Sequence, residues 1–419
     1  MKTQHTQLPK GAWLTVFLLF LVAMLNYLDR IMLVTMRTSV LESIPMSDAE
    51  FGLLTSIFLW VYAALSPFAG FMADRFKRSH VIIVSLIVWS IVTWLTGHAQ
   101  SYNQLLLFRA LMGISEAFYI PAALALIVDY HRGPTQSLAT GLHLAGIMLG
   151  QSLGFIGGWI AEQHSWGLAF NSFGLVGVAY AFVLIFLLKE PNHQHVHVTN
   201  EKERKKQESS EKVNFWNILK TLFTKPAYIY LLVFWGLLGL VSWIISAWLP
   251  TYYKETFNLS QTQAGIYATA YLYPVSIVGA ILAGLITDKW SKKNKYARIM
   301  VPMIGLAIGA PCVFFAGYTA ILPLAIIFFM VNGMTRMAVD DNLMPIMCLF
   351  VENKQRATAY GIMNMFNTFI AGLGIFFIGA LRDMEINLGV IYQVAALSLV
   401  VCIFILLFVK KHIKTVSES

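Results

Sequence analysis

The chain alternates between long apolar runs and short polar segments along almost its whole length. Apolar runs of roughly 15 to 30 residues match the hydrocarbon core of a bilayer, because an α-helix rises about 1.5 Å per residue. The pattern predicts twelve membrane-spanning helices. Their expected limits are residues 11–36, 50–73, 80–97, 103–130, 137–161, 167–188, 227–252, 262–287, 297–317, 321–350, 356–381 and 387–410.

One long polar stretch, residues 189–226, separates the first six predicted spans from the last six. We therefore expect an all-α membrane protein of two six-helix bundles, residues 1–188 and 227–419, joined by a cytoplasmic linker with a candidate interfacial helix. The bundles should be pseudo-symmetric, because the segment at 70–78 after the second span recurs at 284–293 after the eighth.

The repeated segment has a physical rationale at the end of a membrane helix. Glycine permits close helix packing, and an aspartate one turn later can accept hydrogen bonds from amides at a neighbouring helix N-terminus. The basic residues that follow can pair with Asp129 or Glu352, the acids that close the fourth and tenth spans. Such a clasp would hold the halves together in one state and release them in another, whereas the simpler alternative is a positive loop that only fixes topology. The predicted clasp residues are Gly70, Asp74, Arg75, Arg78, Asp129, Gly284, Asp288, Lys289 and Glu352.

Composition and charge support a membrane protein. Hydrophobic residues make up 58% of the chain and charged residues 12%, which a soluble domain would not have. Most of the 30 Lys and Arg residues lie on the side that carries both termini, so we expect cytoplasmic termini and a multi-pass location in a bacterial inner membrane. The net charge of +9 is then a topological signal and does not indicate nucleic-acid binding. We expect a monomer without enzyme activity, cofactor or metal, and the sequence has no Walker loop, dinucleotide fingerprint or nucleophile elbow.

Several ionisable residues fall inside the predicted spans. They are Asp29, Arg30, Arg109, Glu116, Arg336, Asp340 and Asp341. A charge near the centre of a bilayer costs about 2.5 to 3.5 kcal/mol on insertion scales, so these residues imply partners, water or substrate inside the bundle. The chain is therefore predicted to be a transporter.

The charges of the first and fourth spans suggest a division of roles. Arg109 and Glu116 lie on nearly one helix face, about 10.5 Å apart along the axis, so they can address one cavity without forming a tight pair. Asp29 and Arg30 diverge by about 100°, and we expect Arg30 to meet an anionic substrate while Asp29 points toward Arg109. Glu116 and Asp29 are candidate proton carriers, because burial disfavours a charged carboxylate and a nearby arginine favours it. The alternative is a permanent ion-pair network that only fixes helix packing.

The tenth span allows two interpretations. Arg336 and Asp340 are four residues apart, so they either pair along the helix, leaving Asp341 to face another neighbour, or take part in coupling. Aromatic and amide side chains inside the spans could complete a cavity with Arg30 and Arg109, because buried polar groups need partners; the alternative for each is packing. The candidate lining residues are Tyr27, Tyr62, Tyr119, Tyr271, Asn364 and Asn367.

The twelve spans, the central linker and the paired loops at Asp74 and Asp288 together resemble the major facilitator superfamily over essentially the whole chain. Four local segments are similar to the anion:cation symporter family, whose bacterial members take up sugar acids with protons, and Spinster-like transporters share much of this pattern. The segments are residues 26–30 (Asn-Tyr-Leu-Asp-Arg), Arg109 with Glu116, residues 248–252 (Trp-Leu-Pro-Thr-Tyr) and residues 356–361 (Arg-Ala-Thr-Ala-Tyr-Gly).

The resemblance implies proton-coupled symport of a small organic anion, such as a hexuronate or aldonate, by alternating access. Residues 146–150 are apolar where sugar-acid members often present a polar side chain, so the substrate stays open. Two other classes remain. A Spinster-like exporter of lipids or amphiphiles would need an apolar, laterally open cavity, and a non-transporting nutrient receptor of the same fold would need a signalling partner.

Overall fold

The computed structural model describes residues 8–131, 135–191, 215–294, 296–352 and 355–418. These residues form helices and connecting turns, with no strand among them. Most of the predicted linker, residues 192–214, lies outside the described residues. The domain limits expected from the sequence therefore stay predictions, although helices end and begin on either side of this segment.

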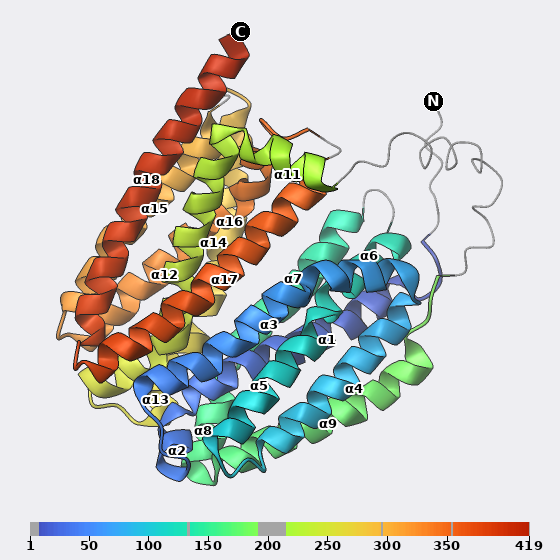
Figure 1. The fold of residues 1–419 in the computed structure, drawn as a ribbon, viewed down its shortest axis with the longest axis vertical. Helices are drawn as coiled ribbons and strands as arrows, with labels where there is room; N and C mark the ends of the chain where they lie inside the picture. Colours follow the sequence, from blue (N-terminus) through green and yellow to red (C-terminus); the bar gives the residue numbers. More distant parts are fainter. Residues whose placement is uncertain (1–7, 132–134, 192–214, 295, 353–354, 419) are drawn as a thin grey trace.

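The helices before the linker form one bundle (Figure 1). They are α1 (Ala12–Thr35), α2 (Arg37–Ser43), α3 (Asp48–Arg75), α4 (Arg78–Thr96), α5 (Tyr102–Ala117), α6 (Tyr119–Tyr130), α7 (Gln136–Ser152), α8 (Phe155–Gln163) and α9 (Trp166–Leu187). The helices after the linker form the second bundle. They are α11 (Phe215–Phe223), α12 (Pro226–Thr256), α13 (Gln261–Ile266), the π-helix η1 (Tyr267–Tyr271), α14 (Leu272–Ser291), α15 (Ala297–Tyr318), α16 (Leu322–Met347), α17 (Arg356–Asp383) and α18 (Leu388–Glu418).

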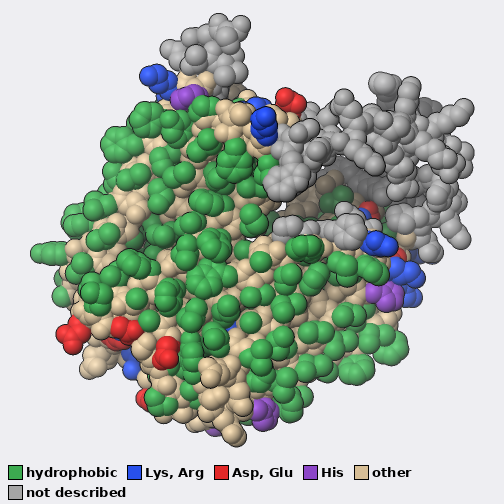
Figure 2. Space-filling view, in the orientation of Figure 1, with side chains coloured by type: hydrophobic (Ala, Val, Ile, Leu, Met, Phe, Trp, Pro, Cys, Tyr) green, Lys and Arg blue, Asp and Glu red, His purple; other side chains and the backbone are tan. Residues whose placement is uncertain are grey.

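The described residues contain 12 helical stretches, some made of two or three consecutive elements, that are long and apolar enough to cross a membrane. This confirms the predicted number of spans. Figure 2 shows hydrophobic side chains over the middle of the visible face, with acidic and basic side chains nearer its two ends. Phe186, on α9, is 73% exposed, which suits a side chain in contact with lipid. The protein is therefore a multi-pass membrane protein.

Proline accounts for two interruptions in these spans. α5 ends at Ala117, four residues before Pro121, whose ring would clash with the carbonyl oxygen of that residue in a continuous helix. Pro121 then falls in the first turn of α6, where it needs no intrahelical donor. The π-helix η1 precedes Pro274, which cannot donate a hydrogen bond to Ala270.

The two bundles meet at one end and spread toward the other (Figure 1). We call the end with α2 and α13 the far end and the end with α11 the linker end. α3 of the first bundle crosses α17 of the second so closely that glycine is required at two positions of the contact. A Cβ on Gly52 would lie 2.9 Å from the carbonyl oxygen of Ile375, and a Cβ on Gly379 would collide with the backbone of Asp48. These close approaches hold the bundles together near the far end.

An ionic network seals the far end. Asp48, at the start of α3, lies between Arg37 of its own bundle and Arg382 of the other, with 2.8 Å between the Arg382 Nε and an Asp48 carboxylate oxygen. Glu255, at the end of α12, accepts a second hydrogen bond from Arg382 at 2.9 Å. Asp383 accepts from the amides of residues 48 and 49 at the exposed α3 N-terminus. The far end is therefore closed by charge pairs that cross between the bundles.

The clasp residues at the linker end are placed only in part. Arg78 pairs with Asp129 inside the first bundle, while Asp288 lies 3.4 Å from Arg298, in the first turn of α15 of the second bundle. Lys289 and Glu352 are both exposed. Arg75 is also exposed, and Gly284 faces Asp341 across a 4.0 Å gap measured from a Cβ built on the glycine. The side chains of Gly70 and Asp74 lie outside the described residues, so the clasp stays a prediction.

Breaking the far-end network should favour opening of that end. The substitution Asp48→Asn leaves Arg37 and Arg382 without their shared anion, and we expect the central cavity to become accessible from the far side about fivefold faster, which corresponds to roughly 1 kcal/mol. The rate at which an impermeant maleimide labels Gln151→Cys, in a background without the three native cysteines, measures this. Glu42→Gln, an exposed acid at the same end, is the control, and equal rates in both variants would contradict the prediction.

Candidate functional site

Four charged side chains from α1 and α5 are buried together in the first bundle. Asp29 is 3% exposed, Arg30 6%, Arg109 2% and Glu116 0%. Within α1, adjacent side chains point in directions about 100° apart, so Asp29 reaches α4 while Arg30 reaches α5. The burial of four charges in one place confirms that the spans enclose a polar centre.

Arg30 and Glu116 form the tightest ion pair of this centre. The Arg30 Nε donates to a Glu116 carboxylate oxygen at 2.6 Å. Aromatic rings surround the guanidinium, whose central carbon lies 4.5 Å from the ring centroid of Tyr27, 4.8 Å from Phe58 and 4.9 Å from Tyr62. The negative faces of these rings help to stabilise the desolvated cation.

This pairing is a contact that the sequence did not predict. Arg30, the residue that we expected to meet an anionic substrate, is held by Glu116 in this structure, so its contact with substrate stays a prediction. Asp29 is attracted electrostatically by Arg109, but its hydrogen-bond partner is Thr93 of α4, which donates at 2.5 Å. Spacing along single helices could not show which side chains meet across helices.

The ion centre is not fully satisfied. Buried polar atoms without a hydrogen-bond partner are the Arg30 Nη2, Arg109 Nε, Asp29 Oδ1 and Glu116 Oε1. Each such atom costs about 1 to 3 kcal/mol in a protein interior. The contacts of the described residues therefore leave part of the hydrogen-bonding capacity of this centre unused.

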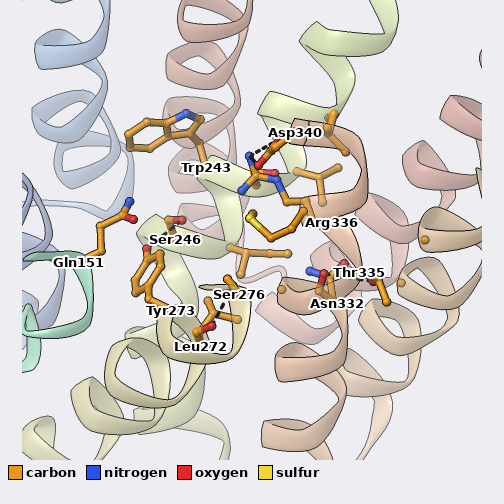
Figure 3. Close-up of a pocket in the computed structure, with 18 of the residues that line it drawn as sticks. Gln151, Trp243, Ser246, Leu272, Tyr273, Ser276, Asn332, Thr335, Arg336 and Asp340 are labelled. Carbon is orange, nitrogen blue, oxygen red and sulfur yellow. Dashed lines mark hydrogen bonds and ion pairs between the residues drawn. The ribbon is translucent and has the colours of Figure 1, made fainter. Parts of the chain in front are cut away.

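A cavity of about 230 Å³ lies between the bundles (Figure 3). The first bundle contributes Tyr27 of α1 and three residues of α7, among them Gln151. Most of its wall comes from α12, α14, α15 and α16 of the second bundle. We call this space the central cavity.

One face of α16 supplies the charges of the central cavity. Asn332, Thr335, Arg336 and Asp340 follow helical spacing and line it together. Figure 3 shows Arg336 and Asp340 joined, and their closest atoms lie 3.4 Å apart. The structure thus contains the pair along the helix that was one of the two interpretations of this span.

A second, much smaller cavity of about 20 Å³ touches the ion centre. Arg30 and Arg109 line one side of it, and Trp243 and Ser246 of α12 line the other. Trp243 and Ser246 also line the central cavity, so a single turn of α12 separates the two spaces. A cavity of this size can hold about one water molecule.

The other residues predicted from the sequence fall into three groups. Tyr27 lines the central cavity, and Tyr62 packs against Arg30. The hydroxyl of Tyr119 donates to the Leu19 carbonyl oxygen at 2.9 Å, and Asn367 donates to that of Trp235 at 2.6 Å; neither residue lines either cavity. The remaining residues, Tyr271 and Asn364, are exposed and also lie outside both linings.

The position of Asp341 is a further outcome. Its side chain is exposed and faces Gly284 on α14, so it does not share the orientation of its neighbour Asp340. Adjacent residues on a helix point about 100° apart, which accounts for the difference.

Several lining residues were missed. Gln151, Ser246, Tyr273, Asn332 and Thr335 all present polar groups to the central cavity. Asn332 and Thr335 could have been found, because they lie on the helix face of Arg336. Ser246 and Tyr273 carried no such signal, and the contact between their hydroxyl groups, at 3.4 Å, joins two helices.

The sequence and the fold are similar to those of known proteins. The model of the Major Facilitator Superfamily matches residues 19–375. Protein spinster homolog 1 of Xenopus tropicalis is 24% identical, covering 88% of this chain and 72% of that protein. A protein named probable sulfoacetate transporter, from Cupriavidus necator, is 25% identical and covers 82% of this chain and 81% of its own length.

A solved structure shares the fold. It is that of a bacterial homolog to the human lysosomal transporter Spinster in an inward-facing and occupied conformation. The TM-score is 0.74, the sequence identity is 21%, and the match covers 97% of each chain. The likeness in fold therefore extends over nearly the whole chain.

Removing one partner of the buried pair should destabilise the protein. Glu116→Ala leaves the Arg30 cation buried without an anion, so we expect the free energy of unfolding to fall by about 3 to 5 kcal/mol. Denaturant unfolding in detergent measures the loss. The double variant Arg30→Met with Glu116→Leu should recover most of it, because no buried charge is left unpaired. An unchanged midpoint for Glu116→Ala would show that water reaches the pair.

Proposed function

The chain belongs to the major facilitator superfamily of membrane transporters, and we propose that it is a proton-coupled symporter of a small organic anion that works by alternating access. The observation that carries this proposal is the buried pair of Arg30 and Glu116 beside cavities between the bundles. A permanent cation held by a protonatable acid is the arrangement that links anion binding to proton binding.

Charge balance supplies the coupling. The guanidinium of Arg30 stays charged at all physiological pH values, whereas the carboxylate of Glu116 can take up a proton. Once Glu116 is neutral, Arg30 has lost its anion, and a substrate carboxylate can replace it through a two-pronged, charge-assisted hydrogen bond. Without the proton, a substrate anion would enter beside a carboxylate and meet repulsion and a desolvation cost.

Asp29 and Arg109 form the other half of the centre. The short hydrogen bond from Thr93 holds Asp29 close to α4, and Arg109 adds a second positive charge to the wall of the small cavity. Asp29 is thus the alternative to Glu116 as the proton carrier of the first bundle. Arg109 would keep the centre attractive to anions while Arg30 changes partners.

Alternating access is supported by the uneven ends of the molecule. The far end is closed by two ion pairs that cross between the bundles, Asp48 with Arg382 and Arg37 with Glu255, and the bundles spread toward the linker end (Figure 1). With the basic residues and both termini in the cytoplasm of a bacterial cell, this is a state closed to the outside. Opening requires the Asp48 network to break while contacts form at the linker end.

The substrate class rests on chemistry and on relatives. Arginines favour carboxylate or sulfonate groups, and a relative is named for an organic anion, sulfoacetate. The amide and hydroxyl groups of Gln151, Asn332 and Thr335 can serve the hydroxyl groups of a sugar acid. A hexuronate or an aldonate is therefore a first substrate to test.

A second candidate is an amphiphilic anion handled by a Spinster-like exporter. The specific observation is that apolar side chains cover much of the central cavity: Leu238, Val241, Ile245, Leu306, Met337 and Leu399. Such a wall suits an acyl or aromatic body whose acidic head binds an arginine. Uptake of hexuronate and of a lysolipid by the same vesicles would separate the two candidates.

Proton coupling should depend on Glu116. The substitution Glu116→Gln keeps the shape but cannot release a proton, so we expect proton-driven uptake to be abolished while exchange of internal for external substrate survives. Proteoliposomes with and without a pH gradient, and with a protonophore, provide the measurement.

The matched control is Glu385→Gln, an exposed acid between α17 and α18, which should behave like the unaltered protein. Uptake by Glu116→Gln that still followed the pH gradient would remove Glu116 from the mechanism. Uptake by the unaltered protein that ignored the protonophore for every anion would refute proton coupling itself.

A further inference from the structure

Each bundle holds one arginine–carboxylate pair whose arginine lines a cavity between the bundles. In the first bundle Arg30 of α1 pairs with Glu116 of α5. In the second bundle Arg336 pairs with Asp340 along α16. The two acids are related in sequence as well, because each precedes a proline by five residues in the fourth span of its half.

From this duplication we propose that the substrate is a dianion, whose two acidic groups are bound by Arg30 and Arg336, and that two protons accompany it. The inference rests on the proposed symport function and specifies its substrate class and stoichiometry. It assigns to Arg336 a role in substrate binding and to Asp340 a role as a second proton acceptor.

The surroundings of Arg336 suit an acidic ligand. Arg336 lines the central cavity, and its Nε is buried without a hydrogen-bond partner. Asn332 and Thr335, on the same face of α16, add neutral groups that can hydrogen-bond to a carboxylate. The distance to Asp340, 3.4 Å, is longer than in a tight charge-assisted pair, so Arg336 is held less firmly than Arg30.

The two arginines are connected through a thin partition. Tyr27 lines the central cavity, and its ring lies 4.5 Å from the Arg30 guanidinium. Trp243 and Ser246 line both the central cavity and the small cavity of Arg30. Displacement of the Trp243 ring would join these spaces, and an elongated ligand could then extend from Arg336 to Arg30.

Charge balance sets the number of protons. Each pair is neutral when its acid is ionised, so a dianion would add two uncompensated negative charges to a largely apolar space. Protonation of Glu116 and Asp340 removes two negative charges and frees both arginines. The net charge of the site with the dianion and two protons bound therefore equals the net charge of the empty site. A monoanion would use only one pair and leave the other closed.

Other groups near the two acids leave this balance intact. Asp340 and Tyr360 of α17 are close enough to interact electrostatically, and so are Arg336 and Tyr273 of α14. Asp341 follows Asp340 directly in α16 and adds a second acid close to it. Glu116 is surrounded by the following groups already described: Arg30, Arg109, Asp29 and Tyr62.

The test compares dicarboxylates with their own monoesters. Proteoliposomes containing the full chain are assayed with α,ω-dicarboxylates of increasing length, from four to eight carbons, and with the monomethyl ester of each. We expect at least one dicarboxylate to be transported with an affinity roughly 10- to 100-fold higher than its monoester, because one charge-assisted contact is lost in the ester. Equal affinity for esters and parents at every length would overturn the proposal.

Two variants assign the roles. Arg336→Gln should lower the affinity for the dicarboxylate by the same factor and leave the affinity for the monoester unchanged. The control Lys293→Gln, which removes an exposed charge of the same bundle, should change neither affinity. Asp340→Asn should reduce the ratio of protons to substrate from two to one, as measured from the reversal of flux in opposed pH and substrate gradients. A ratio of one in the unaltered protein, or no change of selectivity in Arg336→Gln, would refute the second site.

The outcomes separate this inference from the proposed function. Proton-driven uptake of monoanions alone would support the proposed symport function and refute the proposal that the substrate is a dianion. Absence of proton-driven uptake for every anion tested would refute both proposals. A melting temperature for each variant within a few degrees of the unaltered protein shows that the folded state is being compared.

Discussion

A guanidinium and a carboxylate separated by 86 residues in the sequence lie 2.6 Å apart inside the first bundle. Neither charge could stay in this interior alone, because an isolated ion in a low-dielectric medium costs several kcal/mol even after the protein relaxes. Arg30 can therefore leave Glu116 only if another anion takes its place or the acid is neutralised. The symport hypothesis is a consequence of this constraint, and the aromatic rings around Arg30 allow the cation to persist while partners change.

The same constraint acts at the far end in a wetter setting. Asp48, Arg37 and Arg382 are 13 to 14% exposed in their side chains, so their pairs exchange with water more readily than the buried pair does. Close packing of α3 against α17 holds the bundles together, while the ion pairs add a contact that can break without leaving charges in a dry interior. A closure of this type is suited to opening and closing, whereas a wide apolar seal would hold one state.

The sequence predicted the spans and their number because the thickness of the bilayer sets how many consecutive apolar residues each membrane helix needs. It also predicted a charged centre, since Asp29, Arg30, Arg109 and Glu116 had no lipid-compatible alternative. It could not predict that Arg30 meets Glu116, because this contact depends on how α1 packs against α5. The roles expected for Tyr119 and Asn367 show the same limit: buried polar groups need partners, and here the partners are backbone carbonyls of neighbouring helices.

The two arginine–carboxylate pairs differ in a way that suggests an order of events. Arg30 and Glu116 are 5% and 0% exposed in their side chains, whereas Arg336 and Asp340 are 32% and 28% exposed and separated by 3.4 Å. In the proposed mechanism, a ligand that enters the central cavity meets the looser pair first, where water partly compensates the separation of the charges. Only after Trp243 moves does the ligand reach the tighter pair, whose opening without a proton would leave a bare carboxylate in an apolar interior. In the proposed mechanism, burial thus makes the opening of the Arg30–Glu116 pair the step that depends more strongly on protonation.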